Sequence, residues 1–168
     1  IGEQLVFHWH KVYNLPVNSI RIFNAYGPRQ SSRAVIPTII SQFATLNQDK
    51  NVVRVGNLKT SRDFVYVKDT VSGLINLLKP SCKPGEVYNI CTGKSFKIND
   101  IILSLKKITN LNPQIIVSKN RFRKAEVYNL RGSNKKIYNS TKWKPKYLNY
   151  VGFQKALAET YEWFKDEK

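Results

Sequence analysis

One arginine in this sequence is placed where it could bind phosphate oxygens. Arg62 directly precedes the run DFVYV at 63–67, whose apolar and β-branched residues predict a strand, so its guanidinium would stand at the mouth of that strand. A planar guanidinium can bind two oxygens of a diphosphate at once, which a lysine ammonium does less well. The alternative is a surface arginine paired with Asp63 or Asp69.

The histidines and cysteines do not predict a metal site. His8 and His10 are two residues apart in a predicted helix and therefore point to different faces. Cys82 and Cys91 lack the Cys-x-x-Cys spacing of zinc and redox sites. We expect both thiols to be reduced, with Cys91 buried at the end of a strand.

The chain is strongly basic. It carries 28 Lys and Arg against 11 Asp and Glu, a formal net charge of +17. Dense positive charge attracts phosphates, but the longest concentrations, at 119–124 and 142–146, are short and broken by aromatic residues. We attribute most of the charge to composition and part of it to a basic nucleotide-binding cleft. A basic nucleic-acid-binding module is the alternative from another class, although the sequence has no recognition-helix, zinc or RNP-type signature.

Length and hydropathy are those of a globular chain. With 168 residues and 42% hydrophobic residues, one domain can bury roughly 70% of its unfolded surface. No apolar run approaches the ~20 residues of a membrane span, and no signal peptide is visible, so we expect a cytoplasmic protein without a membrane partner. The chain has no methionine and begins at Ile1, from which we expect it to be truncated.

Strand-like runs alternate with helix-like runs. The loop at 24–33 is punctuated by Gly27 and Pro28, and Asp63 and Asp69 are interpreted as a turn residue and a helix cap. The periodicity predicts helices at 2–14, 35–47, 69–79, about 99–109, 134–140 and 151–165, and strands at 18–23, 51–55, 63–67, 86–90 and 114–118. This alternation predicts an α/β fold with some parallel pairing.

Three stretches of this sequence resemble the extended short-chain dehydrogenase/reductase family, in particular its nucleotide-sugar epimerases and 4,6-dehydratases. They are RIFNAYGPRQ at 21–30, VGNLKTSRDFVYVKD at 55–69 and GEVYNICTGKSFKINDI at 85–101. Their order and spacing match the family, and the resemblance covers essentially the whole chain. Within the family the 4,6-dehydratases are the best match, and a 4-keto-sugar reductase is nearly as good. The resemblance leaves GDP, UDP and dTDP open as the nucleotide.

The resemblance also implies roles for individual residues. It implies that Asn24 holds the substrate diphosphate or sugar and that the backbone of Ala25 lies near the nicotinamide. It implies that Arg62 and Arg123 bind the diphosphate and that Glu126 reaches the ribose hydroxyls. The remaining substrate-binding residues that it implies contact the nucleotide base, although core packing is the alternative for the first three: Val35, Ile36, Pro37 and Val55.

By the same resemblance, the chain is the C-terminal part of a Rossmann-type fold, consisting of the last sheet strands and a small mixed α/β substrate-binding lobe. Residues 1–34 would be a remnant of the NAD-binding domain, and residues 35–168 the substrate-binding portion interleaved with the last Rossmann strands. The family's Gly-rich loop and catalytic Tyr-x-x-x-Lys pair would lie upstream of Ile1. We therefore expect no catalytic residue here, and NAD or NADP bound mainly by the missing half. The parent would be a homodimeric sugar-nucleotide 4,6-dehydratase or 4-epimerase, with a 4-keto reductase as the alternative.

Overall fold

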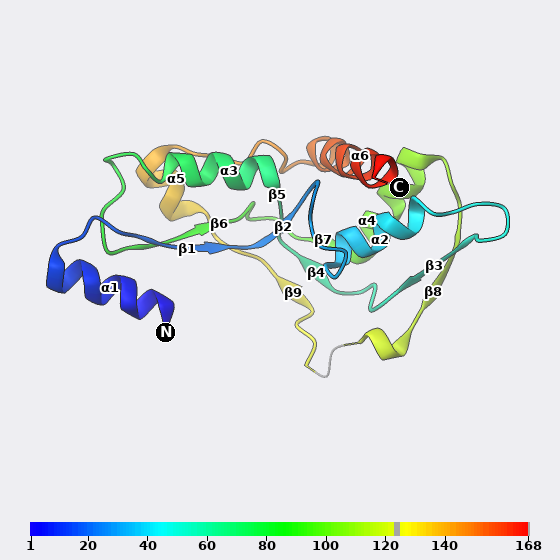
Figure 1. The fold of residues 1–168 in the computed structure, drawn as a ribbon, viewed down its shortest axis with the longest axis horizontal. Helices are drawn as coiled ribbons and strands as arrows, with labels where there is room; N and C mark the ends of the chain where they lie inside the picture. Colours follow the sequence, from blue (N-terminus) through cyan, green and yellow to red (C-terminus); the bar gives the residue numbers. More distant parts are fainter. Residues whose placement is uncertain (123–124, 168) are drawn as a thin grey trace.

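Short strands joined through helices form the framework of the chain. The computed structural model describes residues 1–122 and 125–167 (Figure 1). Its helices are α1 Gly2–Tyr13, α2 Val35–Phe43, α3 Val67–Asn76, α4 Ile98–Thr109, α5 Lys135–Thr141 and α6 Tyr150–Asp166, with a 3-10 turn η1 at Lys119–Arg121. Its strands are β1 Ser19–Ile22, β2 Asn24–Tyr26, β3 Val52–Val55, β4 Ser61–Arg62, β5 Phe64–Tyr66, β6 Val87–Ile90, β7 Phe96–Lys97, β8 Gln114–Val117 and β9 Asn129–Leu130.

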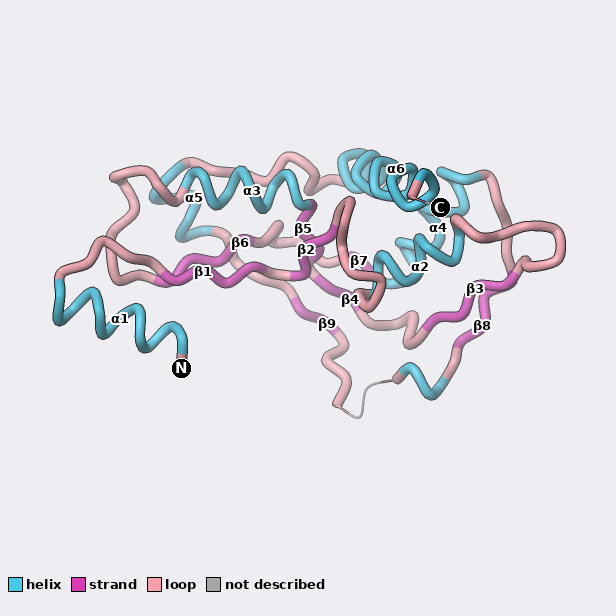
Figure 2. Tube along the Cα trace, viewed as in Figure 1, coloured by secondary structure: helices cyan, strands magenta, loops and turns pink. Residues whose placement is uncertain are grey.

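Most of the strand pairs are parallel, as the alternation of elements predicts. β1 pairs with β6, β2 with β5 and β3 with β8, each in parallel. β4 lies between antiparallel β7 and parallel β9. Figure 2 shows β1 and β6 on the side of the molecule that carries α1, α3 and α5, and β3 and β8 on the side that carries α2. The α/β prediction is confirmed.

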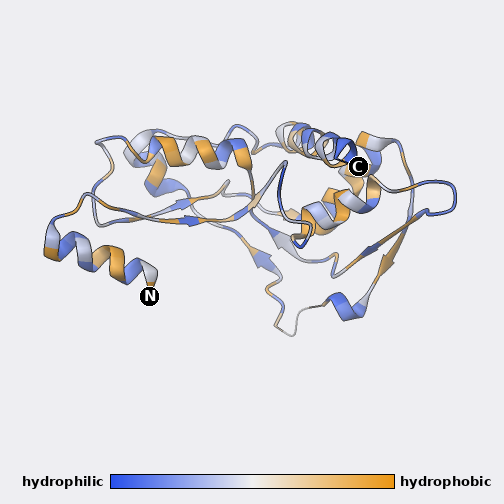
Figure 3. Cartoon of the chain, viewed as in Figure 1, coloured by the Kyte–Doolittle hydropathy of each residue, from blue (hydrophilic) through white to orange (hydrophobic). Residues whose placement is uncertain are grey.

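The core consists of two clusters of buried apolar side chains. The larger cluster joins α2, α4 and α6 and includes Ile40, Leu105 and Leu157, none of which is exposed. The smaller cluster lies between β6 and α5 and includes Tyr88 and Ile137. Burying each such side chain stabilises the fold by about 1.5–3 kcal/mol. The apolar faces of these helices follow the predicted 3.6-residue period (Figure 3).

Helix α1 contrasts with the others because none of its residues is buried. Leu5, Trp9 and Val12 recur at the spacing of one helix face, yet each is about half exposed. A salt bridge of 2.6 Å from Arg21 on β1 to Glu3 connects the helix to the rest of the chain. Both partners are exposed, so the bridge adds little stability.

Two local predictions are wrong. Residues 24–26 are not loop, because Asn24–Tyr26 forms β2 against β5, a pairing with residues some 40 positions later. Asp69 is not a helix cap, because α3 begins at Val67 with Tyr66 as its N-cap. Asp69 is instead buried inside the first turn and accepts hydrogen bonds from the backbone N–H groups of Lys146 and Tyr147, at 2.8 and 2.9 Å.

Among residues 1–122 and 125–167, no helix combines the length and the apolar character that crossing a membrane requires.

Candidate functional site

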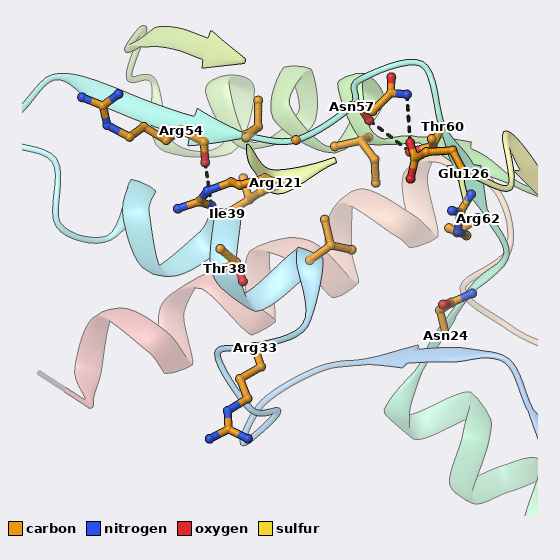
Figure 4. Close-up of a pocket in the computed structure, with 14 residues that line it drawn as sticks. Asn24, Arg33, Thr38, Ile39, Arg54, Asn57, Thr60, Arg62, Arg121 and Glu126 are labelled. Carbon is orange, nitrogen blue, oxygen red and sulfur yellow. Dashed lines mark hydrogen bonds between the residues drawn. The ribbon is translucent and has the colours of Figure 1, made fainter. Parts of the chain in front are cut away.

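A cavity of about 250 Å³ opens between α2, the end of β3 and the end of β4 (Figure 4). Val55 and Arg62 are the last residues of β3 and β4, and Asn24 follows β1. Ligands of open α/β sheets bind outside the carboxyl ends of the strands. The residues that line the cavity are Asn24, Arg33, Val35, Thr38, Ile39, Arg54, Val55, Gly56, Asn57, Thr60, Arg62, Ile98, Arg121 and Glu126.

Arg62 lies in this cavity and is held there by backbone carbonyls. Its Nη1 group donates to the carbonyl oxygens of Ser61 and Val127, at 2.8 and 2.5 Å. No carboxylate pairs with Arg62 in the described part of the chain, so the predicted alternative of pairing with Asp63 or Asp69 is wrong. The guanidinium therefore retains donors for an anion in the cavity.

Asp63 was interpreted above as a turn residue. That interpretation is wrong, because its buried carboxylate accepts hydrogen bonds from backbone groups of distant loops. Its carboxylate is 0% exposed and accepts from the Thr92 N–H and hydroxyl, at 2.8 and 2.6 Å, and from the N–H groups of Gly93 and Gly132, at 2.9 and 3.2 Å. Its own carbonyl accepts from the Asn24 side-chain amide at 3.1 Å. Asp63 thus holds Asn24 beside Arg62.

Cys91 lies close to this carboxylate. The thiol is fully buried, as the sequence predicts. Burial, together with the negative charge of Asp63, raises the pKa of Cys91 to about 12. Cys91 is therefore a neutral core residue at physiological pH.

Glu126 approaches the same cavity from the other side of Arg62. Its Oε2 accepts from the side-chain amide of Asn57 at 2.9 Å (Figure 4). Asn57 is itself fixed, since its carbonyl accepts from the Thr60 hydroxyl at 3.0 Å and its side-chain oxygen from the Lys59 N–H at 3.0 Å. One carboxylate in a cavity with several arginines can accept hydrogen bonds from hydroxyl groups while the arginines bind an anion.

The apolar wall consists of side chains from α2, β3 and α4. Ile39, Val55 and Ile98 are buried, and Val35 at the start of α2 is 40% exposed at the rim. Such a wall suits the flat face of a ring.

The predicted residues divide between the cavity and the rest of the chain. Asn24, Val35, Val55, Arg62 and Glu126 line the cavity. The other predicted residues lie elsewhere. Ile36 and Pro37 do not line it; both are buried on the core side of α2, and Ile36 belongs to the larger core cluster. Ala25 does not line it either; it pairs with Val65, and its carbonyl accepts from Gln30 at 2.7 Å. Arg123 lies outside the described residues.

Three arginines of the cavity were not predicted from the sequence: Arg33, Arg54 and Arg121. They come from the loop before α2, from β3 and from η1. The only sequence signal was the basic concentration at 119–124. Their convergence depends on loop paths that periodicity does not describe.

Two Tyr-x-x-x-Lys spacings occur within the chain, but neither contributes to the cavity. Lys142 lies with its Nζ 5.4 Å from the centre of the Tyr138 ring, and Tyr161 packs in the larger core cluster while Lys165 lies one turn further along α6. Neither pair is among the residues that line the cavity.

The parallel pairs, the covering helices and a cavity at the strand ends define a Rossmann-type α/β protein. The sequence model of the family described as GDP-mannose 4,6 dehydratase matches residues 1–159. The chain therefore belongs to this family of NAD-dependent nucleotide-sugar dehydratases and epimerases.

Individual relatives agree with this assignment. The chain is 34% identical to GDP-6-deoxy-D-mannose reductase of Pseudomonas aeruginosa over 86% of its own length and 48% of the relative's. It is 28% identical to human dTDP-D-glucose 4,6-dehydratase over 98% of its length and 46% of the relative's. The chain thus spans about half the length of the curated relatives it matches.

Solved structures agree as well. The structure of RMD from Pseudomonas aeruginosa complexed with NADPH superposes with a TM-score of 0.88 at 30% identity, covering 99% of this chain and 54% of that one. UDP-glucuronic acid 4-epimerase from Bacillus cereus, in complex with UDP-glucuronic acid and NAD, gives a TM-score of 0.83 at 27% identity, covering 99% and 51%. The predicted extended short-chain dehydrogenase/reductase fold is confirmed.

Proposed function

We propose that this chain is the nucleotide-sugar-binding half of an NAD(P)-dependent sugar-nucleotide 4,6-dehydratase or 4-epimerase of the cytoplasm. The observation that carries the proposal is the cavity itself, in which Arg62 and Asn24 stand beside Glu126 and an apolar wall. A nucleotide sugar offers an anionic diphosphate, ribose hydroxyls and a flat base. The cavity has a matching group for each of the three.

The diphosphate would bind to Arg62 and to the amide of Asn24. Arg62 keeps unbonded donors within the described residues, and Asn24 is oriented by its bond to the Asp63 carbonyl. Arg123 is proposed as a second diphosphate ligand from the family resemblance alone. Charge-assisted bonds to a diphosphate are about twice as strong as neutral ones, and a guanidinium adds a fixed direction.

The nucleoside would lie between Glu126 and the apolar wall. The carboxylate of Glu126 would accept from the ribose hydroxyls, and the base would lie against Val35 and Val55. Ile36 and Pro37 would act indirectly, since their burial fixes the start of α2 beneath the base.

This chain would contact the cofactor of the family at one place. Dinucleotides lie at the carboxyl ends of parallel strands, with the pyrophosphate over a Gly-rich loop. The carboxyl end of β1 continues into Asn24 and Ala25 beside an open hollow lined by Ile22 and Phe23, so these residues fit one wall of a nicotinamide site. The sequence has no Gly-rich loop of this type, so the pyrophosphate would be bound by other parts of a longer chain. NAD or NADP would supply hydride transfer at C4 of the sugar.

A nucleotide-sugar 4-keto reductase is the second candidate. The 34% identity to GDP-6-deoxy-D-mannose reductase over 86% of the chain favours it. Both candidates would bind the nucleotide diphosphate through the same residues. They differ in the chemistry that follows, to which the described residues of this chain contribute no proposed catalytic group.

Binding of nucleoside diphosphates tests the proposal. The protein to titrate is the chain with any natural sequence that flanks it. Isothermal titration calorimetry should detect binding of UDP, GDP or dTDP to this protein, and much weaker binding of orthophosphate. Arg62→Ala should weaken binding by roughly 2–5 kcal/mol, as for a desolvated charge pair that loses one partner. Arg131→Ala is the matched control, since Arg131 is exposed and does not line the cavity. Unchanged affinity in Arg62→Ala would remove Arg62 from the site.

A further inference from the structure

The two side chains proposed to bind the diphosphate are both attached to one residue, Asp63. Arg62 precedes it in the chain, and the side-chain amide of Asn24 donates to the Asp63 carbonyl at 3.1 Å. Figure 4 shows Asn24 and Arg62 on the same side of the cavity. Asp63 itself is 0% exposed and is not among the residues that line the cavity. It can therefore affect a ligand only through Arg62 and Asn24.

The Asp63 carboxylate connects the chain around Arg62 to two distant loops. Two of its four hydrogen bonds come from the N–H and the hydroxyl of Thr92, at 2.8 and 2.6 Å. The other two come from the N–H groups of Gly93 and Gly132, at 2.9 and 3.2 Å. No lysine or arginine forms a salt bridge with Asp63 in the part of the chain that the structure describes. The buried charge is thus compensated by these fixed donors, which ties its position to that of both loops.

A second route from Asp63 to Arg62 runs through the segment that contains β9. The Asp63 N–H donates to the Leu130 carbonyl at 2.8 Å, two residues before Gly132. These contacts fix the end of the segment whose Val127 carbonyl accepts from Arg62 Nη1 at 2.5 Å. Asp63 therefore supports the guanidinium in two ways, through the chain itself and through the carbonyl that orients it.

We infer, resting on the proposed function, that Asp63 is a positioning residue for the diphosphate, whose buried negative charge aligns Arg62 and Asn24 on one anion. Thr92, which supplies two of the four hydrogen bonds, is a second positioning residue. Binding is tighter when donors are held in the bound geometry in advance, because the ligand then does not have to order them. Replacing the carboxylate with an amide leaves at least one loop N–H without an acceptor, and the shift of that loop moves both donors.

Calorimetric titration with UDP, GDP and dTDP, on the chain with any natural flanking sequence, measures this effect. For the nucleotide that the unaltered protein binds most tightly, Asp63→Asn should weaken binding roughly 10- to 100-fold, as for the loss of one hydrogen bond to a charged group. Leu157→Ala is the control for instability, because Leu157 is 0% exposed in the larger core cluster and does not line the cavity. That variant should lose stability but keep its affinity.

Two further comparisons separate positioning from a general structural role. Arg62→Lys keeps a positive charge but not the planar fork. In that background Asp63→Asn should weaken binding much less than in the unaltered protein, because the interaction that Asp63 aligns is already lost. Thr92→Val removes the hydroxyl donor and should weaken binding roughly 3- to 10-fold, whereas Thr92→Ser keeps the hydroxyl and should bind like the unaltered protein. The Thr92 pair decides the inference if Asp63→Asn does not fold.

The outcomes distinguish this inference from the proposed function. The positioning role is overturned by unchanged affinity in Asp63→Asn or, where that variant does not fold, in Thr92→Val. It is also overturned by an equal loss in Leu157→Ala, or by losses from Asp63→Asn and Arg62→Lys that multiply to within about twofold. In each of these cases, weaker binding in Arg62→Ala would still support a nucleotide-diphosphate site. Failure of all three nucleotides to bind the unaltered protein overturns the proposed function and this inference together.

Discussion

Replacing Asp63 with Asn tests how much the buried Asp63 carboxylate stabilises the fold. The carboxylate is fully buried and accepts four hydrogen bonds, two from Thr92, one from Gly93 and one from Gly132. An amide of the same shape has one acceptor atom instead of two. Whichever way it is turned, its NH₂ group faces at least one backbone N–H that then has no acceptor.

The expected loss can be worked out from these bonds. A buried donor left without a partner costs about 1–3 kcal/mol, and hydrogen bonds to a neutral acceptor are about 1 kcal/mol weaker than those to a charged one. The sum is a loss on the order of 2–5 kcal/mol. Because domains of this size are stable by about 5–15 kcal/mol, this is a large fraction of the total.

Urea unfolding followed by circular dichroism measures the effect. With a slope of about 2 kcal/mol per molar urea, the midpoint of Asp63→Asn should fall by roughly 1–2.5 M. Asp49→Asn is the matched control, because Asp49 is exposed and its side chain makes no hydrogen bond or ion pair within residues 1–122 and 125–167. A midpoint for Asp63→Asn within about 0.3 M of the control would refute the argument that this carboxylate connects the loops.

Three further outcomes follow from the packing. The free energy of unfolding should fall as pH rises from about 9 toward 12, by up to ~1.4 kcal/mol per pH unit. The reason is that burial raises the pKa of the folded Cys91 thiol from 9.0 to about 12, so the thiol of the unfolded chain ionises first. Urea midpoints compared with those of Cys91→Ala isolate the effect, and identical pH profiles of the two proteins would contradict it. Gly132→Ala should cost about 1–3 kcal/mol, since its Cβ would lie 2.6 Å from the Cys91 sulfur, whereas Gly2→Ala, with nothing within 4 Å, should not lower the thermal midpoint. Replacing Leu5 and Trp9 with Ser should reduce concentration-dependent association in sedimentation experiments at little cost in stability, because both side chains are about half exposed and lie four residues apart on one face of α1; unchanged association would show that this face does not drive it.

Much of the framework could be predicted from local patterns. The 3.6-residue period located α4 and α6 to within a residue or two at each end, and runs such as VYNI at 87–90 and QIIV at 114–117 located β6 and β8. The motif strings identified the family, and the resemblance predicted binding roles for Asn24, Arg62 and Glu126, which line one cavity. These signals are local, since each depends on side chains within one helix, strand or turn.

Only the tertiary structure decided which residues far apart in the chain contact one another. Asp69 looks like a cap in its own segment, yet it binds backbone groups 77 and 78 residues later. Asp63 looks like a turn residue, yet its partners lie 29 to 69 residues away. Arg121 enters the cavity only because β8 pairs with β3 and Gly56 leaves room beside it. A short-range pattern describes the face that a side chain occupies on its own element, whereas a buried charge takes its hydrogen bonds from whichever backbone the packing of the core brings against it.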